Sequence, residues 1–149
     1  MTVTRVEDNE LLYRAVRANG DEYCVADGVL RITANAFNDR TSKPSVDRSS
    51  VRPDPRDTRL SPTDAVTSLV TEDVREIGPI KIAAPSGPVS YSVDVHHRPI
   101  DGSETEAANP AHCQIECDPE IKSTHYKRVK EALALLATKR GWSVPPNSD

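Results

Sequence analysis

The sequence predicts an α+β fold, in which a mostly antiparallel sheet carries an amphipathic C-terminal helix on one face and a long irregular loop spans about residues 33–62. Short alternating apolar runs, an Asp-Gly pair between two of them, and one sustained helical period near the C-terminus support this prediction. Strands followed by one good helix, without regular strand and helix alternation, favour an antiparallel sheet. The 149 residues suit a single domain over 1–149, and we expect flexible ends at 1–9 and 143–149.

The first half of the chain predicts three strands and then a loop. "LLYRAV" at 11–16 alternates and suits a first strand. In "YCVADGVLRI", Asp27-Gly28 separates two apolar runs and predicts a hairpin with a type I′ turn, because that turn needs positive φ at both central residues. The stretch 33–62 has no sustained period and contains "KPS", "RPDP" and "SP", which predicts an irregular connection.

The second half predicts four further strands and a helical turn. A strand over 65–70 leads into a helical turn that Thr71 caps and that stops at Gly78. The segment "PIKIAAPSGPVSYSVDVHH" predicts two strands joined by a Pro-Ser-Gly-Pro turn, and "NPAHCQIECDPE" predicts another, with Cys113, Ile115 and Cys117 facing inward.

The C-terminal helix has the clearest pattern. Ser123 can cap it, Lys139 and Arg140 lie in its last turn, and Gly141 follows directly. Its apolar residues recur every three or four positions and predict one buried face: Tyr126, Val129, Leu133, Leu136 and Ala137. We expect this face and the Asp27-Gly28 hairpin to pack in one core, through Val29 or Leu30 and Leu133 or Leu136.

Composition indicates a cytoplasmic protein. The start of the chain has no apolar run resembling a signal peptide, and no stretch approaches the length of a membrane span. Three cysteines without export signals suggest reduced thiols. The charge is uneven, because residues 31–59 hold seven basic and four acidic side chains while residues 101–120 hold six acidic ones and no Lys or Arg. The two stretches can neutralise one another or form a polar field.

Familiar enzyme signatures are missing from the sequence. It has no Gly-rich phosphate loop, no G-x-S-x-G, no H-E-x-x-H and no C-x-x-C pair. Ser92, Asp94 and His96 have the residue types of a hydrolase triad, but residues two apart on a strand lie too far from one another to pass a proton.

A zinc site is one alternative for the histidines and cysteines. His96 or His97 could join His112, Cys113 and Cys117, because imidazole and thiolate suit zinc. The cysteines fall on the apolar side of their strand, however, so buried structural thiols are the simpler interpretation and no metal is expected.

The best candidate site lies in "NDRTSKPSVDRSS", residues 38–50. Ser45, Asp47 and Arg48 place a hydroxyl, a carboxylate and a guanidinium close together, and Arg14 on the first strand could lie beneath them. Such a set can bind a phosphate. We expect Phe37 to anchor the loop and to orient it so that both arginines enter one cleft. The alternative is a local surface pair of Asp47 with Arg48 on a solvated loop.

Two further residues are candidates for catalysis. The "NPAH" turn delivers His112, a possible acid or base, to the start of a strand. Glu72, at the start of the helical turn, is a candidate acid.

The order "LYRAV", "AF", "SVDR" and "NPAH" before a terminal helix resembles a family of small uncharacterised bacterial proteins, over roughly Leu11 to Leu136. A looser resemblance is to RES-type and other ADP-ribosyltransferase-like toxin domains, which also begin with a Leu-Tyr-Arg strand. That resemblance implies that Arg14, Ser45 and Glu72 surround NAD, although the Gly-Arg-Phe/Trp-Asn stretch of those domains is represented only by "NAFND".

Two classes of function follow. The first is an accessory or binding module that holds a protein partner or a phosphate-bearing ligand through the basic 38–50 loop, without a cofactor. The second is a small enzyme that processes NAD or another nucleotide, for which a toxin–antitoxin or defence setting is one alternative. Membrane binding is not expected, and nucleic acid is an improbable partner because the pI is about 5.6 and aromatic side chains are few.

Overall fold

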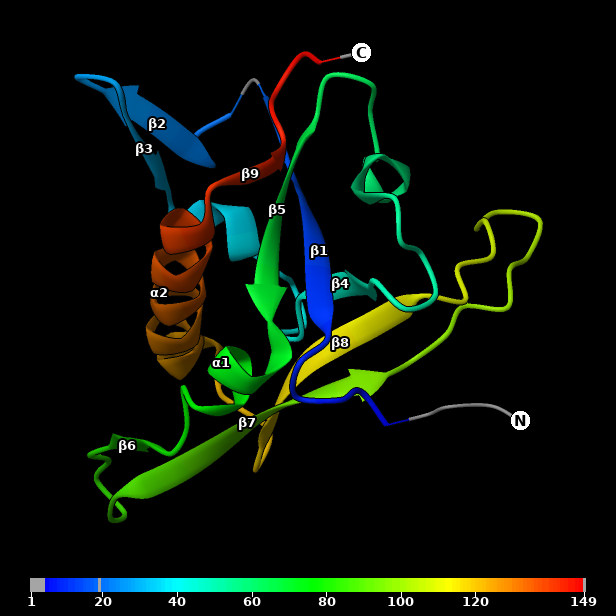
Figure 1. Ribbon diagram of the computed structural model, residues 1–149. Helices are drawn as coiled ribbons and strands as arrows, with labels where there is room; N and C mark the ends of the chain where they lie inside the picture. The colour runs from blue at the N-terminus through cyan, green and yellow to red at the C-terminus, as the bar shows by residue number, and fades with distance from the viewer. Residues whose placement is uncertain (1–4, 19, 149) are drawn as a thin grey trace.

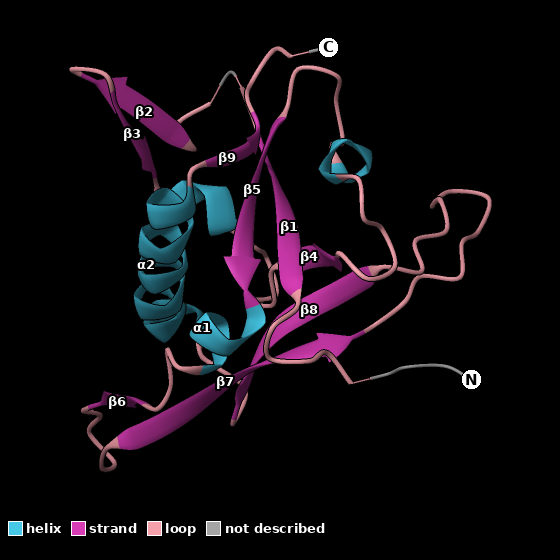
Figure 2. Ribbon diagram, viewed as in Figure 1, coloured by secondary structure: helices cyan, strands magenta, loops and turns pink. Residues whose placement is uncertain are grey.

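The computed structural model, which describes residues 5–18 and 20–148, confirms the predicted α+β fold (Figure 1). Its main sheet is antiparallel throughout, in the order β6-β7-β8-β4-β1-β5-β9, and the long helix α2, Ser123–Arg140, covers one face (Figure 2). The strands of this sheet are β1 Leu11–Val16, β4 Ser45–Arg48, β5 Ala65–Val70, β6 Ile80–Ile82, β7 Val89–His97, β8 His112–Asp118 and β9 Trp142–Val144.

The predicted hairpin is confirmed as a separate two-stranded sheet, β2 Tyr23–Ala26 and β3 Val29–Ile32. Asp27 and Gly28 have φ angles of 53° and 76°, as a type I′ turn requires. Leu30 is half-buried against the main core, whereas Val29 is exposed. The hairpin is also tied to α2, because the Thr138 hydroxyl accepts a hydrogen bond from the Ile32 amide.

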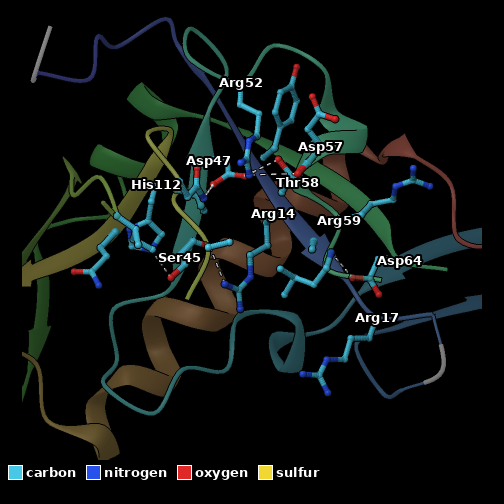
Figure 3. A pocket seen from close by; sticks show the side chains of 18 of the residues that line it. Arg14, Arg17, Ser45, Asp47, Arg52, Asp57, Thr58, Arg59, Asp64 and His112 are labelled. Atoms are coloured by element: carbon cyan, nitrogen blue, oxygen red, sulfur yellow. Dashed lines mark hydrogen bonds and ion pairs between the residues drawn. The ribbon is translucent and has the colours of Figure 1, made fainter. Parts of the chain in front are cut away.

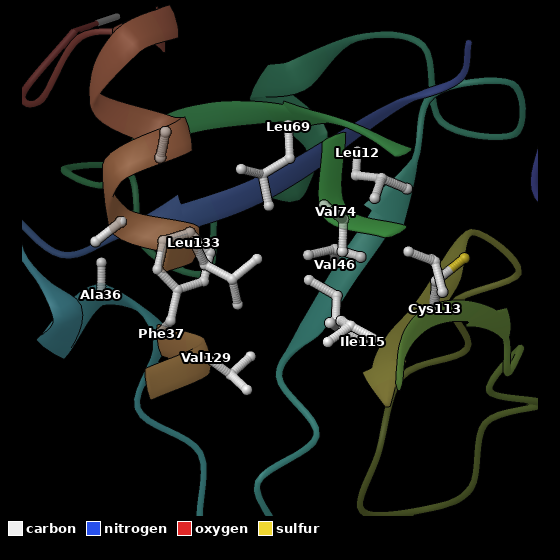
Figure 4. Packing of buried hydrophobic residues seen from close by; sticks show 14 of the residues in the cluster. Leu12, Ala36, Phe37, Val46, Leu69, Val74, Cys113, Ile115, Val129 and Leu133 are labelled. Carbon is white, nitrogen blue, oxygen red and sulfur yellow. The ribbon is translucent and has the colours of Figure 1, made fainter. Parts of the chain in front are cut away.

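The core fills the space between the sheet and α2 (Figure 4). Leu133 is completely buried, as the helical period predicts, and Gly141 ends the helix with a φ of 76°. The cap prediction was wrong by one residue, since Lys122 is the N-cap and no side chain caps the helix. Strand residues with alternate numbers contribute the other wall of the core: Leu12, Val46, Leu69, Val93, Val95, Cys113 and Ile115.

The prediction of one irregular loop over 33–62 was wrong. The stretch contains the 3₁₀ helices η1, Ala34–Phe37, and η2, Pro55–Thr58, and between them β4, which lies between β1 and β8 in the sheet. β4 has no hydrophobic alternation that would predict a strand, because Val46 is its only residue in the hydrophobic core. Phe37 is fully buried, as expected of an anchor, and its carbonyl accepts a hydrogen bond from Tyr126.

Residues in or next to the two expected flexible ends contribute to the fold. Val6 is buried in the core, and Trp142–Val144 forms β9 along β5. Residues 1–4 and 149 lie outside the described part of the chain.

The short helix α1, Thr71–Arg75, follows β5 directly and ends before the expected Gly78. Val70, whose backbone is extended, is its N-cap in place of Thr71, and the Thr71 hydroxyl donates to the carbonyl of Glu10.

In the described chain, no helix combines the length and apolar character needed to cross a membrane.

Candidate functional site

A cleft of about 1180 Å³ opens on the face of the sheet that α2 does not cover (Figure 3). Because strand side chains alternate, the neighbours of the core residues Leu12, Val46 and Cys113 point to this opposite face. Segments around 52–64 and 98–109 form its walls. Its floor comes from three adjacent strands: Tyr13 and Ala15 on β1, Ser45 and Asp47 on β4, and His112 and Gln114 on β8.

Arg14 lines one end of this cleft, although alternation along β1 places its side chain on the same side of the sheet as Leu12, where it reaches Phe37. The pairing of β1 with β4 stops at Tyr13 and Asp47, and beyond that point the Arg14 guanidinium donates to the Ser45 carbonyl at 2.8 Å. It also donates to the carbonyls of Ala36 at 3.0 Å and Asn38 at 3.3 Å. Three of its five N–H donors are thus used, which leaves two.

Arg14 makes no ion pair with a carboxylate in the described chain. Its guanidinium carbon lies 5.6 Å from the centre of the buried Phe37 ring, a cation–π arrangement. Burial lowers the pKa of this guanidinium, against smaller opposing effects of Tyr126 and Glu22, yet an arginine remains charged at any physiological pH. No carboxylate of the described chain contacts Arg14 directly, although Glu22 lines the same cleft and acts on it at longer range.

Ser45 and His112 form a hydrogen-bonded pair across β4 and β8. His112 Nδ1 lies 2.7 Å from the Arg98 carbonyl oxygen, and Nε2 lies 2.8 Å from Ser45 Oγ. A carbonyl oxygen can only accept, so Nδ1 carries a proton and Nε2 of the neutral ring is an acceptor for the Ser45 hydroxyl. Ser45 and His112 thus have the arrangement of a nucleophile and its base, and the Arg98 carbonyl orients the base.

Asp47 faces the cleft but is already occupied. Its Oδ2 accepts hydrogen bonds from Arg52 at 3.0 Å and Thr58 at 2.9 Å, and its Oδ1 accepts one from the Asn109 amide at 2.8 Å. These partners come from both walls of the cleft. Asp47, predicted to contact ligand, therefore joins the walls to the floor.

Arg48 does not share the site, so the expectation that it enters a cleft with Arg14 was wrong. Its side chain lies almost wholly buried outside the cleft lining and donates to both carboxylate oxygens of Glu10, at 3.0 and 2.8 Å. The alternative of a surface pair between Asp47 and Arg48 was also wrong, because successive strand residues point to opposite faces.

The electrostatics of the Arg48 pair are those of a structural ion pair. Burial alone would raise the pKa of Glu10, but hydrogen bonds from Arg48 and Ser50 outweigh it and hold this pKa below its ordinary value.

Glu72 also lies away from the cleft. It is exposed on α1 and does not line the cleft, so it is not brought together with Arg14 and Ser45.

The residues considered for zinc are not gathered, and no group of three or more His, Cys, Asp or Glu within residues 5–18 and 20–148 could hold a metal ion. Cys113 points to the core, and burial raises its pKa to about 12 and that of Cys117 to about 11. Both thiols are protonated at neutral pH and are poor metal ligands in that form. The three cysteines are free.

Sequence reasoning gave Asn109 no role beyond opening the turn before His112, and it missed Gln114. The Asn109 side chain accepts from the Ala111 amide at 3.0 Å while it donates to Asp47, so it holds the turn that presents His112; its place in "NPAH" was the available signal. Gln114 lies directly opposite Ser45 in the β4–β8 register, and its side chain makes no hydrogen bond with described residues. Nothing in the sequence marks it.

Three other arginines of the cleft already have partners. Arg52 pairs with Asp47, Arg98 pairs with Glu116, and Arg59 donates to the carbonyls of Arg56, Pro62 and Ser148. The lining as a whole is not positive, because it contains five arginines and six carboxylates: Arg14, Arg17, Arg52, Arg59 and Arg98 against Asp21, Glu22, Asp47, Asp57, Asp64 and Glu106.

Comparison of the chain with protein-family models, with curated proteins and with solved structures gave no match. The site is therefore argued from its geometry alone.

Proposed function

We propose that the protein binds a phosphate-bearing small molecule in the cleft, with the Arg14 guanidinium as its anion contact. The observation that carries this proposal is a half-buried arginine held by three carbonyls, without a carboxylate partner in the described chain and with two N–H donors left over. An unpaired buried charge is costly, and an anionic ligand would supply the missing counter-charge. Guanidinium N–H groups match the paired oxygens of a phosphate.

The shape of the cleft favours a small molecule over a protein partner. Its volume of about 1180 Å³ slightly exceeds the range of about 300–1,000 Å³ that is usual for small-molecule sites. The cavity also has a fixed floor of three paired strands, so little ordering entropy opposes binding.

Processing of NAD or another nucleotide is the second candidate. Arg14 and Ser45 share the cleft with His112, which supports nucleotide entry, but Glu72 lies elsewhere. An enzyme of this class would have to use His112 in place of the expected acid.

A thermal-shift screen tests the proposal with inorganic phosphate, ADP, ADP-ribose and NAD. At a hundredfold excess over its dissociation constant, a ligand that binds only the folded state stabilises it by about 2.7 kcal/mol, which a melting curve resolves. We expect at least one member to raise the melting temperature of the parent. The Arg14→Lys variant keeps the charge but loses the paired donors, and should respond much less; an unresponsive parent, or equal responses of parent and variant, would refute the proposal.

A further inference from the structure

We infer that Ser45 and His112 are a catalytic nucleophile and base, and that the cleft hydrolyses carboxylic esters whose anionic group is held by Arg14. This inference deepens the proposed function and rests on it, because it needs a cleft that admits a small anionic ligand. It adds a reaction to the binding.

The nucleophile and its base meet the geometric requirements for proton transfer. The distance of 2.8 Å between Ser45 Oγ and His112 Nε2 is a normal hydrogen bond, and both side chains line the cleft. The Arg98 carbonyl fixes the tautomer, because it accepts from Nδ1 at 2.7 Å. It occupies the place of the carboxylate in a serine–histidine–aspartate triad and leaves Nε2 free to take the serine proton.

The arrangement is built by two non-local contacts. The β4–β8 register pairs Asp47 with His112 and Ser45 with Gln114, so the imidazole reaches diagonally to the serine. Asn109 bonds to Asp47 and to the Ala111 amide, which fixes the turn immediately before His112.

A donor for the developing oxyanion lies beside the serine. Gln114 is directly opposite Ser45 on the same face, where Cβ atoms of paired strand residues lie roughly 4.5–5.5 Å apart. Its amide makes no hydrogen bond with the described residues and is therefore free to donate to a carbonyl oxygen that becomes negative. An ester carbonyl develops this charge on a single oxygen, which one amide can meet.

The proposed reaction has two steps. Ser45 Oγ attacks the ester carbonyl carbon while its proton passes to His112 Nε2; the tetrahedral intermediate then breaks its bond to the alcohol oxygen, which takes that proton and leaves. Water next attacks the acyl-serine with His112 again accepting a proton, and the carboxylic acid leaves as Ser45 regains its hydrogen. Water is the only co-reactant, and Arg14 holds the substrate in place by its anionic group.

The test uses phenylmethylsulfonyl fluoride, whose sulfur is attacked by an activated serine with loss of fluoride. We expect the intact mass of the full chain to increase by one sulfonyl adduct and peptide mapping to place the adduct on Ser45. His112→Gln should slow labelling by about 100-fold or more, because it removes the base. Ser92→Ala is the matched control: Ser92 is another strand serine, bonded only to the Asp118 carbonyl, and its loss should leave labelling unchanged.

The parent protein alone can overturn the inference, so a variant that fails to fold does not obscure the result. An unlabelled parent, an adduct on another serine, or a folded His112→Gln variant that reacts at the parental rate would each contradict it. The thermal-shift screen separates the two proposals. A phosphate ligand that binds while Ser45 stays unlabelled refutes the inference alone, whereas labelled Ser45 without any binding of the phosphate panel supports the dyad and refutes the proposed ligand.

Discussion

Arg14 and Arg48 lie on neighbouring strands, but Arg48 is fully buried whereas Arg14 is half-buried, and their guanidinium groups have different kinds of partner. Arg48 donates to both oxygens of the Glu10 carboxylate, which is itself buried. Arg14 donates only to backbone carbonyls, which offer partial charges, and keeps two N–H groups. The comparison teaches that burial of an arginine does not distinguish a structural role from a binding role; the nature of its partner does.

The largest expected effect comes from breaking the Arg48 pair. Glu10→Gln leaves a buried guanidinium without its counter-charge, and we expect a loss of about 3–5 kcal/mol in the free energy of unfolding by urea denaturation. Glu7→Gln is the control, since the Arg5–Glu7 pair is 62% and 65% exposed and should contribute less than about 1 kcal/mol. Similar losses in both variants would contradict the structural role of Arg48.

The next largest effect is expected at Leu133 of α2, which is completely buried against the sheet. Leu133→Ala should cost about 2–5 kcal/mol, measured by the same denaturation, because the cavity it leaves lies in the core. Leu135→Ala is the control, as Leu135 is 60% exposed on the same helix and should change stability little. The cleft lies on the opposite face of the sheet, so ligand binding by the folded protein should be retained in both variants.

A smaller loss of stability is expected at Arg14. Arg14→Lys keeps a cation near the three carbonyls, so we expect it to lower the free energy of unfolding by about 1–2 kcal/mol, less than Glu10→Gln does. Its binding of a phosphate ligand should weaken at least about tenfold, since paired charge-assisted hydrogen bonds are lost. A variant as unstable as Glu10→Gln would place Arg14 among the structural arginines.

The smallest effect is the pH dependence of the Arg48 pair. Because the pKa of Glu10 is lower in the folded state, its contribution is fully present above the ordinary glutamate pKa of about 4.3 and is lost as pH falls through the lower folded value. Urea midpoints between pH 7 and pH 3 should therefore fall less steeply for Glu10→Gln than for the parent. Parallel curves would contradict the assigned shift.

The local elements of the fold could be predicted from the sequence. The Asp27-Gly28 turn and the helix that ends at Gly141 are specified by residues within a few positions of one another. The strand β4 could not be predicted, because its polar side chains are satisfied by distant partners: Arg48 by Glu10, and Asp47 by Asn109. Its place in the sheet depends on those partners.

The sequence allowed the types of residue in the candidate site to be predicted, but not which individual residues line it. One cleft is lined by four of the predicted residues, Arg14, Ser45, Asp47 and His112. They lie close together only because of the register of three strands that are distant in sequence. Arg48 is one residue from Asp47, yet the alternation of the strand places it on the opposite face.

The two arginines can be compared directly in one titration. Nitrogen-15 spectra of the parent resolve arginine Nε–H signals as well as backbone amides, so ADP-ribose can be added while both side chains are observed. The account predicts that the Arg14 Nε–H signal and the amides of Ser45 and His112 shift with a common dissociation constant, while the Arg48 Nε–H signal stays in place. Shifts centred on Arg48 and Glu10, or no shift at Arg14 at any concentration of ADP-ribose, would contradict it.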